Sequence, residues 1–157
     1  MTSTQIFINN EIAKIIALSV HIGTRFPATS TSMGMVMLAD LSPSQLDRAL
    51  KIAPTSTVVP RVQLTRKQID ISLAKIRKQG WALSDETLSF GIRSVAAPVR
   101  NAQGQTIAAI NVTVNAAETS VKTLTEKYLP LLLKTASNIT QDFVSFGLLP
   151  TTEPLSK

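Results

Sequence analysis

The stretch SVAAPVRNAQGQTIAAINVTV, residues 94–114, decides the fold of this 157-residue chain. It contains two runs rich in apolar residues, Ser94–Arg100 and Thr106–Val114, on either side of the sequence Asn-Ala-Gln-Gly at 101–104. Asparagine and glycine favour tight turns because both residues tolerate a left-handed backbone. We therefore predict a β-hairpin with antiparallel strands.

The second strand of this hairpin has one polar face. Side chains alternate between the two faces of a strand, so Asn111 and Thr113 share a face, and pairing brings the strand of Ser94 alongside. These three polar groups are candidates for one wall of a ligand pocket. The alternative is a polar face that meets water, which is the default for an antiparallel sheet. The opposite face, directed toward covering helices, is formed by Ile110, Val112 and Val114.

Two capping boxes mark the starts of two helices that precede the hairpin in the sequence. Ser-Pro-Ser-Gln at 42–45 begins a short helix that reaches Leu50, and Thr-Arg-Lys-Gln at 65–68 begins a second helix that ends at Gly80. Residues 53–60 between them are expected to form a loop. Helical spacing gives the second helix one buried stripe, formed by Ile69, Leu73 and Ile76.

Both ends of the chain add regular structure. Gln5–Asn9 and Ala13–Val20 are β-branched and apolar, and we expect them to form a first hairpin. From Thr119 to Phe143 apolar residues keep helical spacing, with Pro130 expected to kink or restart the helix. The whole pattern predicts an α+β fold in which helices flank an antiparallel sheet.

The segment Gly23–Gly34, GTRFPATSTSMG, is rich in small hydroxyl residues. Hydroxyls and free backbone N–H groups at a helix start can bind a carboxylate, so this segment is a candidate anion-binding loop. The alternative is a turn of serine and threonine that caps a helix over Met33–Ala39. The segment lacks the GxxxxGK(S/T) spacing of a phosphate-binding loop.

The formal charge of +6 raises the question of nucleic-acid binding. The densest basic region, Arg61–Lys78, has no aromatic residue for base stacking and no recognition turn. A solvated helix face is therefore the favoured interpretation of this region, and weak, nonspecific binding to nucleic acid is the alternative. The N-terminus does not resemble a secretory signal and no apolar run is long enough for a membrane span, so we expect a cytoplasmic protein without a membrane partner.

Catalytic chemistry has little support. The chain has no cysteine, which excludes thiol nucleophiles and thiolate zinc sites. The single histidine, His21, has no evident triad or metal cluster around it, and Asp85 and Glu86 point in alternate directions on an extended chain. We expect no enzyme activity, no metal and no cofactor. A small enzyme that acts on an organic acid is the alternative.

Several motifs, taken in order, resemble the effector-binding domain of the IclR family of bacterial transcription regulators. They are GTRFPA at 23–28, TSMG at 31–34, Gly80-Trp81, GIRSVAAPVR at 91–100, Gly104 and AAINV at 108–112. The likeness extends from about Ala17 to Phe143 and is closest to the branch that regulates protocatechuate, 4-hydroxybenzoate and other β-ketoadipate-pathway genes. It implies a GAF-like domain in which a curved antiparallel sheet and a crossing loop and helix enclose a ligand.

The resemblance also implies a role and a site. The domain would sense an organic or aromatic acid and control catabolic genes through the arrangement of a homodimer or homotetramer, and an assembly-only domain is a further alternative. Residues 1–147 would form the domain, without its first elements, and 148–157 a flexible tail. DNA would be read only by a winged helix-turn-helix that this sequence lacks. The ligand-binding positions would be Ser32, Met33, Gly34, Ser84, Asp85, Ser94, Asn111 and Thr113, with His21, Arg25 and Arg93 as further candidates.

Overall fold

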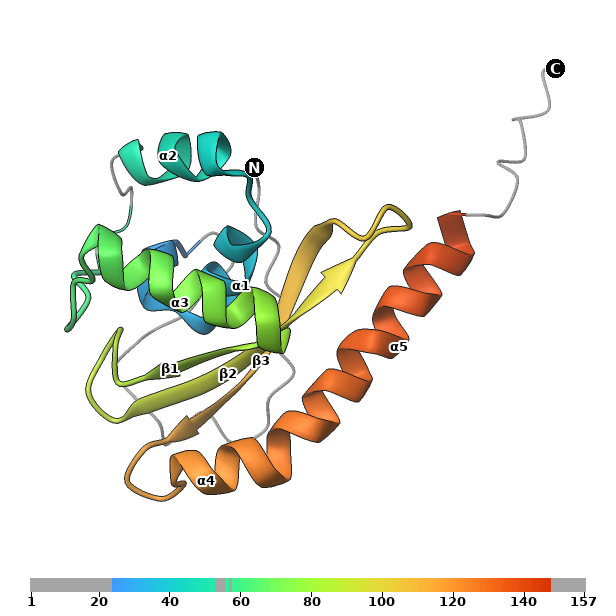
Figure 1. Cartoon of the computed structure of the whole chain (residues 1–157). Coiled ribbons are helices and arrows are strands. Elements are labelled where there is room, and N and C mark those ends of the chain that lie inside the picture. The colour runs from blue at the N-terminus through green and yellow to red at the C-terminus, as the bar shows by residue number, and fades with distance from the viewer. Residues whose placement is uncertain (1–23, 53–55, 57, 148–157) are drawn as a thin grey trace, which may run out of the picture.

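The computed structural model describes residues 24–52, 56 and 58–147, which form three layers (Figure 1). A three-stranded antiparallel sheet lies between helices α1 and α3 on one side and the C-terminal helix α5 on the other. This arrangement confirms the α+β class. The elements are α1 (Ser32–Ala39), α2 (Pro43–Lys51), α3 (Arg66–Gln79), β1 (Ala82–Asp85), β2 (Ile92–Arg100), β3 (Thr106–Asn115), α4 (Val121–Thr123) and α5 (Leu129–Gly147).

The hairpin of β2 and β3 is confirmed. Its strands pair antiparallel, with Ser94 opposite Thr113 and Ala96 opposite Asn111. The side chain of Asn101 accepts two backbone N–H groups of the turn, and Gly104 takes the left-handed conformation that the turn requires, at φ 77°. Strand β1, which the sequence analysis did not predict, pairs with the outer edge of β2.

Both capping boxes form as the sequence predicts. Ser42 caps α2 and Thr65 caps α3, each with its glutamine returning the hydrogen bond. Helix α3 ends at Gly80, whose φ of 82° is the left-handed conformation typical of a helix end. The predicted stripe of α3 is buried with α1 and one face of the sheet, and Leu73 is fully inaccessible to solvent. Truncation of Leu73 to alanine would therefore cost about 2–5 kcal/mol.

The other face of the sheet packs on the C-terminal helix. Val95 and Ala97 of β2 are buried with Leu124, Leu129 and further apolar side chains, and the predicted apolar face of β3 joins them. The expected interruption near Pro130 takes the form of a π-helical turn, Leu124–Tyr128, in which the Leu129 N–H donates to the Leu124 carbonyl. The wider turn accommodates a proline that would crowd a regular α-helix.

Two predicted elements lie outside the described residues. These are the first hairpin, over 5–9 and 13–20, and the tail after Gly147. The described part of the chain contains no helix that is both long and apolar enough to cross a membrane.

Candidate functional site

A cluster of buried serines joins the start of α1 to the sheet. The hydroxyl oxygens of Ser32 and Ser94 lie 2.8 Å apart and form a hydrogen bond between helix and central strand. Ser84 of β1 lies beside Ser94 and donates its hydroxyl to the Ser30 carbonyl at 3.3 Å. All four serines are nearly inaccessible to solvent, and Ser32 is only 1% exposed. The cluster therefore places several hydroxyl groups in an otherwise apolar interior.

The polar row continues across the sheet toward solvent. Ser84, Ser94 and Thr113 occupy paired positions on three adjacent strands, and paired residues share a face. Asn111, the next residue on the same face of β3, donates its side-chain amide N–H to the Thr113 hydroxyl at 2.8 Å. Asn111 is half-buried and Thr113 is exposed. The prediction that Asn111 and Thr113 share one face of the sheet with Ser94 is therefore confirmed. Helix α1 covers this face at Ser94 and leaves it open at Thr113.

The start of α1 is the nearest source of backbone donors. Thr31 caps the helix, because its hydroxyl accepts the Gly34 N–H at 3.1 Å, which confirms the capping interpretation of this segment. The N–H groups of Ser32 and Met33 have no acceptor among the described residues. Backbone N–H groups at a helix start favour an anion electrostatically. Capping and anion binding are therefore compatible at this helix end.

Gly34 is required by close packing. A Cβ atom at this position would lie 2.5 Å from the Ala28 Cα and 2.7 Å from its carbonyl carbon, and would overlap the carbonyl oxygen. The loop before α1 therefore folds directly against the first helical turn. Thr31, which caps α1, and Ser30, whose carbonyl accepts the Ser84 hydroxyl, were not predicted as site residues.

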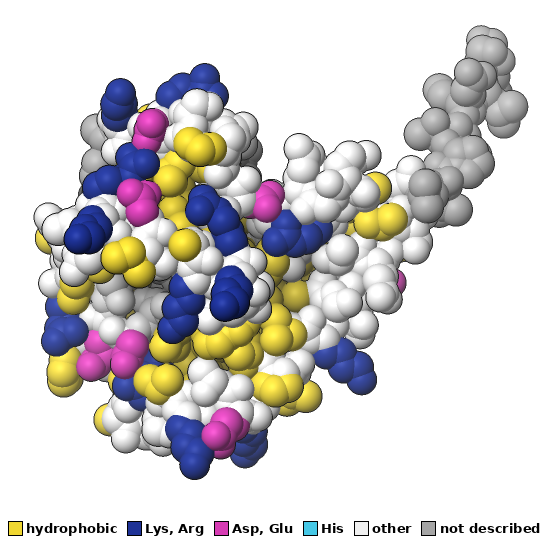
Figure 2. Space-filling model, viewed as in Figure 1, with side chains coloured by type: hydrophobic (Ala, Val, Ile, Leu, Met, Phe, Trp, Pro, Cys, Tyr) yellow, Lys and Arg dark blue, Asp and Glu magenta, His cyan; other side chains and the backbone are white. Residues whose placement is uncertain are grey.

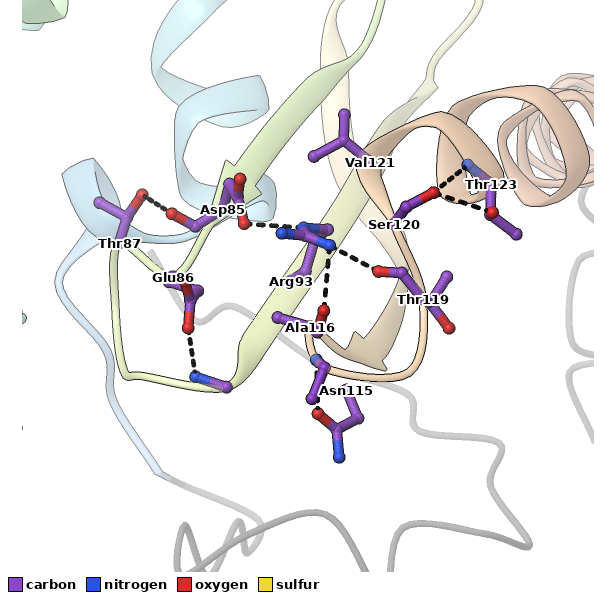
Figure 3. Close-up of polar contacts among 12 residues, drawn as sticks. Asp85, Glu86, Thr87, Arg93, Asn115, Ala116, Thr119, Ser120, Val121 and Thr123 are labelled. Atoms are coloured by element: carbon purple, nitrogen blue, oxygen red, sulfur yellow. Dashed lines mark hydrogen bonds and ion pairs between the residues drawn. The ribbon is translucent and has the colours of Figure 1, made fainter.

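Arg93 and Asp85 form a separate polar group (Figure 3). They alternate with Ser94 and Ser84, so their side chains leave the opposite face of the sheet. The Arg93 Nε donates to Asp85 at 2.7 Å, and Nη1 donates to the carbonyls of Ala116 and Thr119 at 3.3 and 2.5 Å. These contacts tie β2 to the loop that enters α4. The structure therefore does not bring Arg93 and Asp85 together with the serine cluster.

Arg25 and His21 are the two remaining charged candidates. Arg25 lies in the loop before α1 and its side chain is exposed. His21 lies outside the described residues. No group of histidine, aspartate and glutamate side chains within the described ranges is arranged to hold a metal ion.

The serine cluster does not line either of two hollows on the described surface. One, of about 390 Å³, lies between α2 and α3 and is lined by Thr29, Asp47, Leu50, Lys51, Arg66 and Ile69. Hydrogen bonds from Arg66 to Asp47 and Asp70 hold the pKa of Arg66 above its ordinary value. The second, of about 140 Å³, is lined by residues that include Asp40, Arg77 and Arg100.

Asp40 links the end of α1 to the hairpin. Its carboxylate accepts the Thr106 N–H at 2.7 Å and an Arg100 N–H at 3.0 Å. Burial raises the pKa of Asp40, but the hydrogen bonds from Thr106 and Arg100 outweigh burial, and the pKa lies below its ordinary value. The helix that carries Ser32 at one end is thus fixed to the sheet at its other end by an ionised carboxylate.

Comparison with known proteins identifies the family. The family model described as the C-terminal domain of the bacterial transcriptional regulator IclR matches residues 6–141. The chain belongs to the IclR family. The resemblance stated from the motifs is therefore confirmed.

Among curated relatives, this IclR-family chain is 30% identical over 128 residues to the Pca regulon regulatory protein of Pseudomonas putida. It is 33% identical over 125 residues to the p-hydroxybenzoate hydroxylase transcriptional activator of Acinetobacter baylyi. These matches cover 82% and 76% of the chain, but only 44% of each relative. The chain thus spans less than half the length of the curated relatives it matches.

Solved structures confirm the GAF-like fold of IclR-family effector domains. A putative transcriptional regulator from a Rhodococcus species aligns with a TM-score of 0.74 at 36% identity, covering 85% of this chain and 53% of that one. The inducer-binding domain of PobR from Acinetobacter, a double mutant in complex with 3-hydroxybenzoic acid, aligns with a TM-score of 0.69 at 30% identity. That match covers 80% of this chain and 73% of the PobR chain.

Proposed function

We propose that this IclR-family domain senses a small carboxylated metabolite at the buried serine cluster and thereby controls catabolic genes in the cytoplasm. The observation that carries the proposal is the hydroxyl pair of Ser32 and Ser94, which lies beside the uncapped N–H groups at the start of α1. Buried hydroxyls and a helix N-terminus together suit a carboxylate. DNA would be read by a winged helix-turn-helix outside this sequence.

The proposed binding step replaces one hydrogen bond with several. A ligand carboxylate would accept the N–H groups of Ser32 and Met33 and the hydroxyl protons of Ser32 and Ser94. The bond between the two serines would then break, and α1 would move relative to the sheet. A ligand that binds the moved arrangement more tightly would raise the fraction of domains in that arrangement. The size of the shift depends on the ratio of the ligand's affinities for the two arrangements. Arg25 and His21 are candidates for an additional charged contact.

The relatives favour a hydroxylated aromatic acid as the ligand. One of them is named as a transcriptional activator of p-hydroxybenzoate hydroxylase, another is the Pca regulon regulatory protein, and the PobR domain is in complex with 3-hydroxybenzoic acid. In this chain, the half-buried Met33 would contact the ring, while Asn111 and Thr113 would face a ring hydroxyl. Ser84 completes the same row. We propose binding without turnover, because the known relatives are transcriptional regulators and the cluster pairs no nucleophile with a base.

Thermal-shift titration tests this proposal directly. A ligand that binds only the folded domain raises its melting temperature. The probes are protocatechuate, 4-hydroxybenzoate, 3-hydroxybenzoate, muconate, β-ketoadipate, pyruvate and glyoxylate. We expect a shift with one or more of the aromatic acids that Ser94→Ala abolishes and that Ser44→Ala, an exposed change on α2, leaves intact. A shift that persists in Ser94→Ala would reject the serine site, and no shift with any acid would favour a domain used for assembly alone.

We also propose that the domain acts in a homodimer or homotetramer joined through the distal half of α5. Ile139, Phe143 and Phe146 continue the stripe by which the first half of α5 packs on the sheet, but are 39%, 51% and 72% exposed. Figure 1 shows this half of the helix running beside the far end of the β2–β3 hairpin, away from the rest of the fold. Asp142 is the only charged side chain among residues 139–147, so a second apolar helix suits the stripe.

Light scattering at micromolar concentration tests the assembly. We expect an oligomeric mass for the wild-type chain and a monomeric mass for the double variant Phe143→Ser/Phe146→Ser. The control is Leu131→Ser, since Leu131 is 64% exposed and lies about a quarter turn around the helix from this stripe. A monomeric wild-type chain, or an oligomer that survives the double variant, would reject α5 as the interface.

A further inference from the structure

The solvent side of α3 is a ridge of lysines. Helical spacing turns Ile69, Leu73 and Ile76 inward, and the opposite face therefore carries Lys67, Ile71, Ala74, Lys75 and Lys78. All five of these side chains are exposed. The three lysines form the lysine ridge, which extends over about 16 Å of helix at 1.5 Å per residue.

No acidic side chain in the described part of the chain forms an ion pair with this ridge. The nearest acid on α3, Asp70, accepts two hydrogen bonds from Arg66, at 2.9 and 3.0 Å, and Arg66 also binds Asp47 of α2. Within the described ranges, no ion pair involves Lys67, Lys75 or Lys78. The neighbouring basic side chain of Arg77 donates to the Ala39 carbonyl and so faces α1 instead. The ridge thus keeps its full charge.

The surrounding surface extends the positive region. The last turn of α2 contributes Arg48 and Lys51, both exposed, and the ion pair between Arg66 and Asp47 holds α2 against α3. Figure 2, in which α3 faces the viewer, shows lysine and arginine side chains distributed over these helices. Acidic side chains on the same face are fewer than basic ones and lie among them. A partner that contacts this face must therefore carry negative charge.

We propose that the lysine ridge makes a sequence-independent contact with the phosphate backbone of duplex DNA. A second copy of the chain is unsuitable because its ridge would repel this one. Protein interfaces are depleted in lysine, and the ridge has no aromatic side chain to insert into a lipid surface. Duplex DNA presents one phosphate per about 3.4 Å of each strand, so a ridge of about 16 Å spans several phosphates. In a transcription regulator, DNA bound elsewhere in the assembly would lie at high effective concentration.

The contact predicts a measurable salt dependence. Three phosphate contacts give a slope of about −2.7 in a plot of log affinity against log salt, equivalent to roughly a fortyfold loss between 50 and 200 mM. The probe is a fluorescent duplex of arbitrary sequence, titrated with the whole 157-residue chain in anisotropy experiments. Changing the duplex sequence should leave the affinity unchanged, because lysine–phosphate contacts carry no base information.

A charge-matched pair of variants tests the location. The salt slope should be lost in the ridge variant, Lys67→Gln/Lys75→Gln/Lys78→Gln. The control variant, Lys122→Gln/Lys127→Gln/Lys134→Gln, removes the same charge from exposed positions on the far side of the sheet. The control should retain most of the salt slope. Circular dichroism melting verifies that both variants fold. Equal loss in both variants, undetectable wild-type binding at 50 mM salt, or tighter binding to vesicles of phosphatidylserine than to the duplex would each overturn the proposal.

Discussion

Ser32 and Ser94 are 62 positions apart in the sequence, and their hydroxyl groups share one buried hydrogen bond of 2.8 Å. The bond connects the first turn of α1 to the central strand of the sheet. A ligand that breaks this bond would therefore act on both the helix and the sheet.

Replacing either serine by alanine should destabilise the domain by about 1–3 kcal/mol, because the remaining hydroxyl is buried without its partner. The double variant should lose less than the sum of the two single changes, with a coupling of about 1 kcal/mol. Urea unfolding measures all three variants, and Ser44→Ala on the exposed face of α2 serves as the near-neutral control. Strict additivity would show that the two hydroxyls do not cooperate.

Gly34→Ala should destabilise the domain by about 1–3 kcal/mol, since the new methyl group would overlap the backbone of Ala28. Gly147→Ala is the matched control, because a Cβ there meets no atom within 4 Å. That change should be neutral or stabilising by up to about 1 kcal/mol, as alanine favours a helix over glycine. Similar melting temperatures for the two variants would contradict the close approach at Gly34.

Asp40→Asn should reduce stability near pH 7 and remove part of the acid sensitivity of the domain. The pKa of Asp40 is lower in the folded chain than in the unfolded chain, so its ionised form stabilises the fold at pH values above about 4. This stabilisation is lost as the pH falls through the folded pKa. Urea unfolding from pH 7 to 2.5 should show the wild-type and variant curves converging in acid, and Asp142→Asn is the exposed control.

Arg93→Lys should lower the melting temperature while leaving any ligand-induced shift unchanged. Lysine keeps the charge but loses the planar set of donors that joins Asp85 to the carbonyls of Ala116 and Thr119. Thermal melting with and without a ligand that stabilises the wild-type chain measures both quantities. Loss of the ligand shift with an unchanged baseline would instead assign Arg93 to the ligand.

Local patterns were sufficient for much of the fold. The hairpin of β2 and β3, the two capped helices and the buried stripe of α3 each depend on residues within a few positions of one another, and their turn, cap and spacing preferences act before tertiary packing. β1 was missed because its four residues, Ala82–Asp85, are too few to show a distinct pattern. The face shared by Asn111 and Thr113 followed from alternation, and the predicted hairpin added Ser94.

The sequence by itself determined the family, the strand pairing of the hairpin and the starts of α2 and α3, because short-range backbone preferences and the order of the motifs carry that information. Only the tertiary structure decided that Ser32 lies on Ser94, that Arg93 faces away from both, and that a π-helical turn accommodates Pro130. These relations depend on how helices and strands distant in the chain pack to exclude water. Packing is a collective property of many side chains, and no local pattern of residues encodes it.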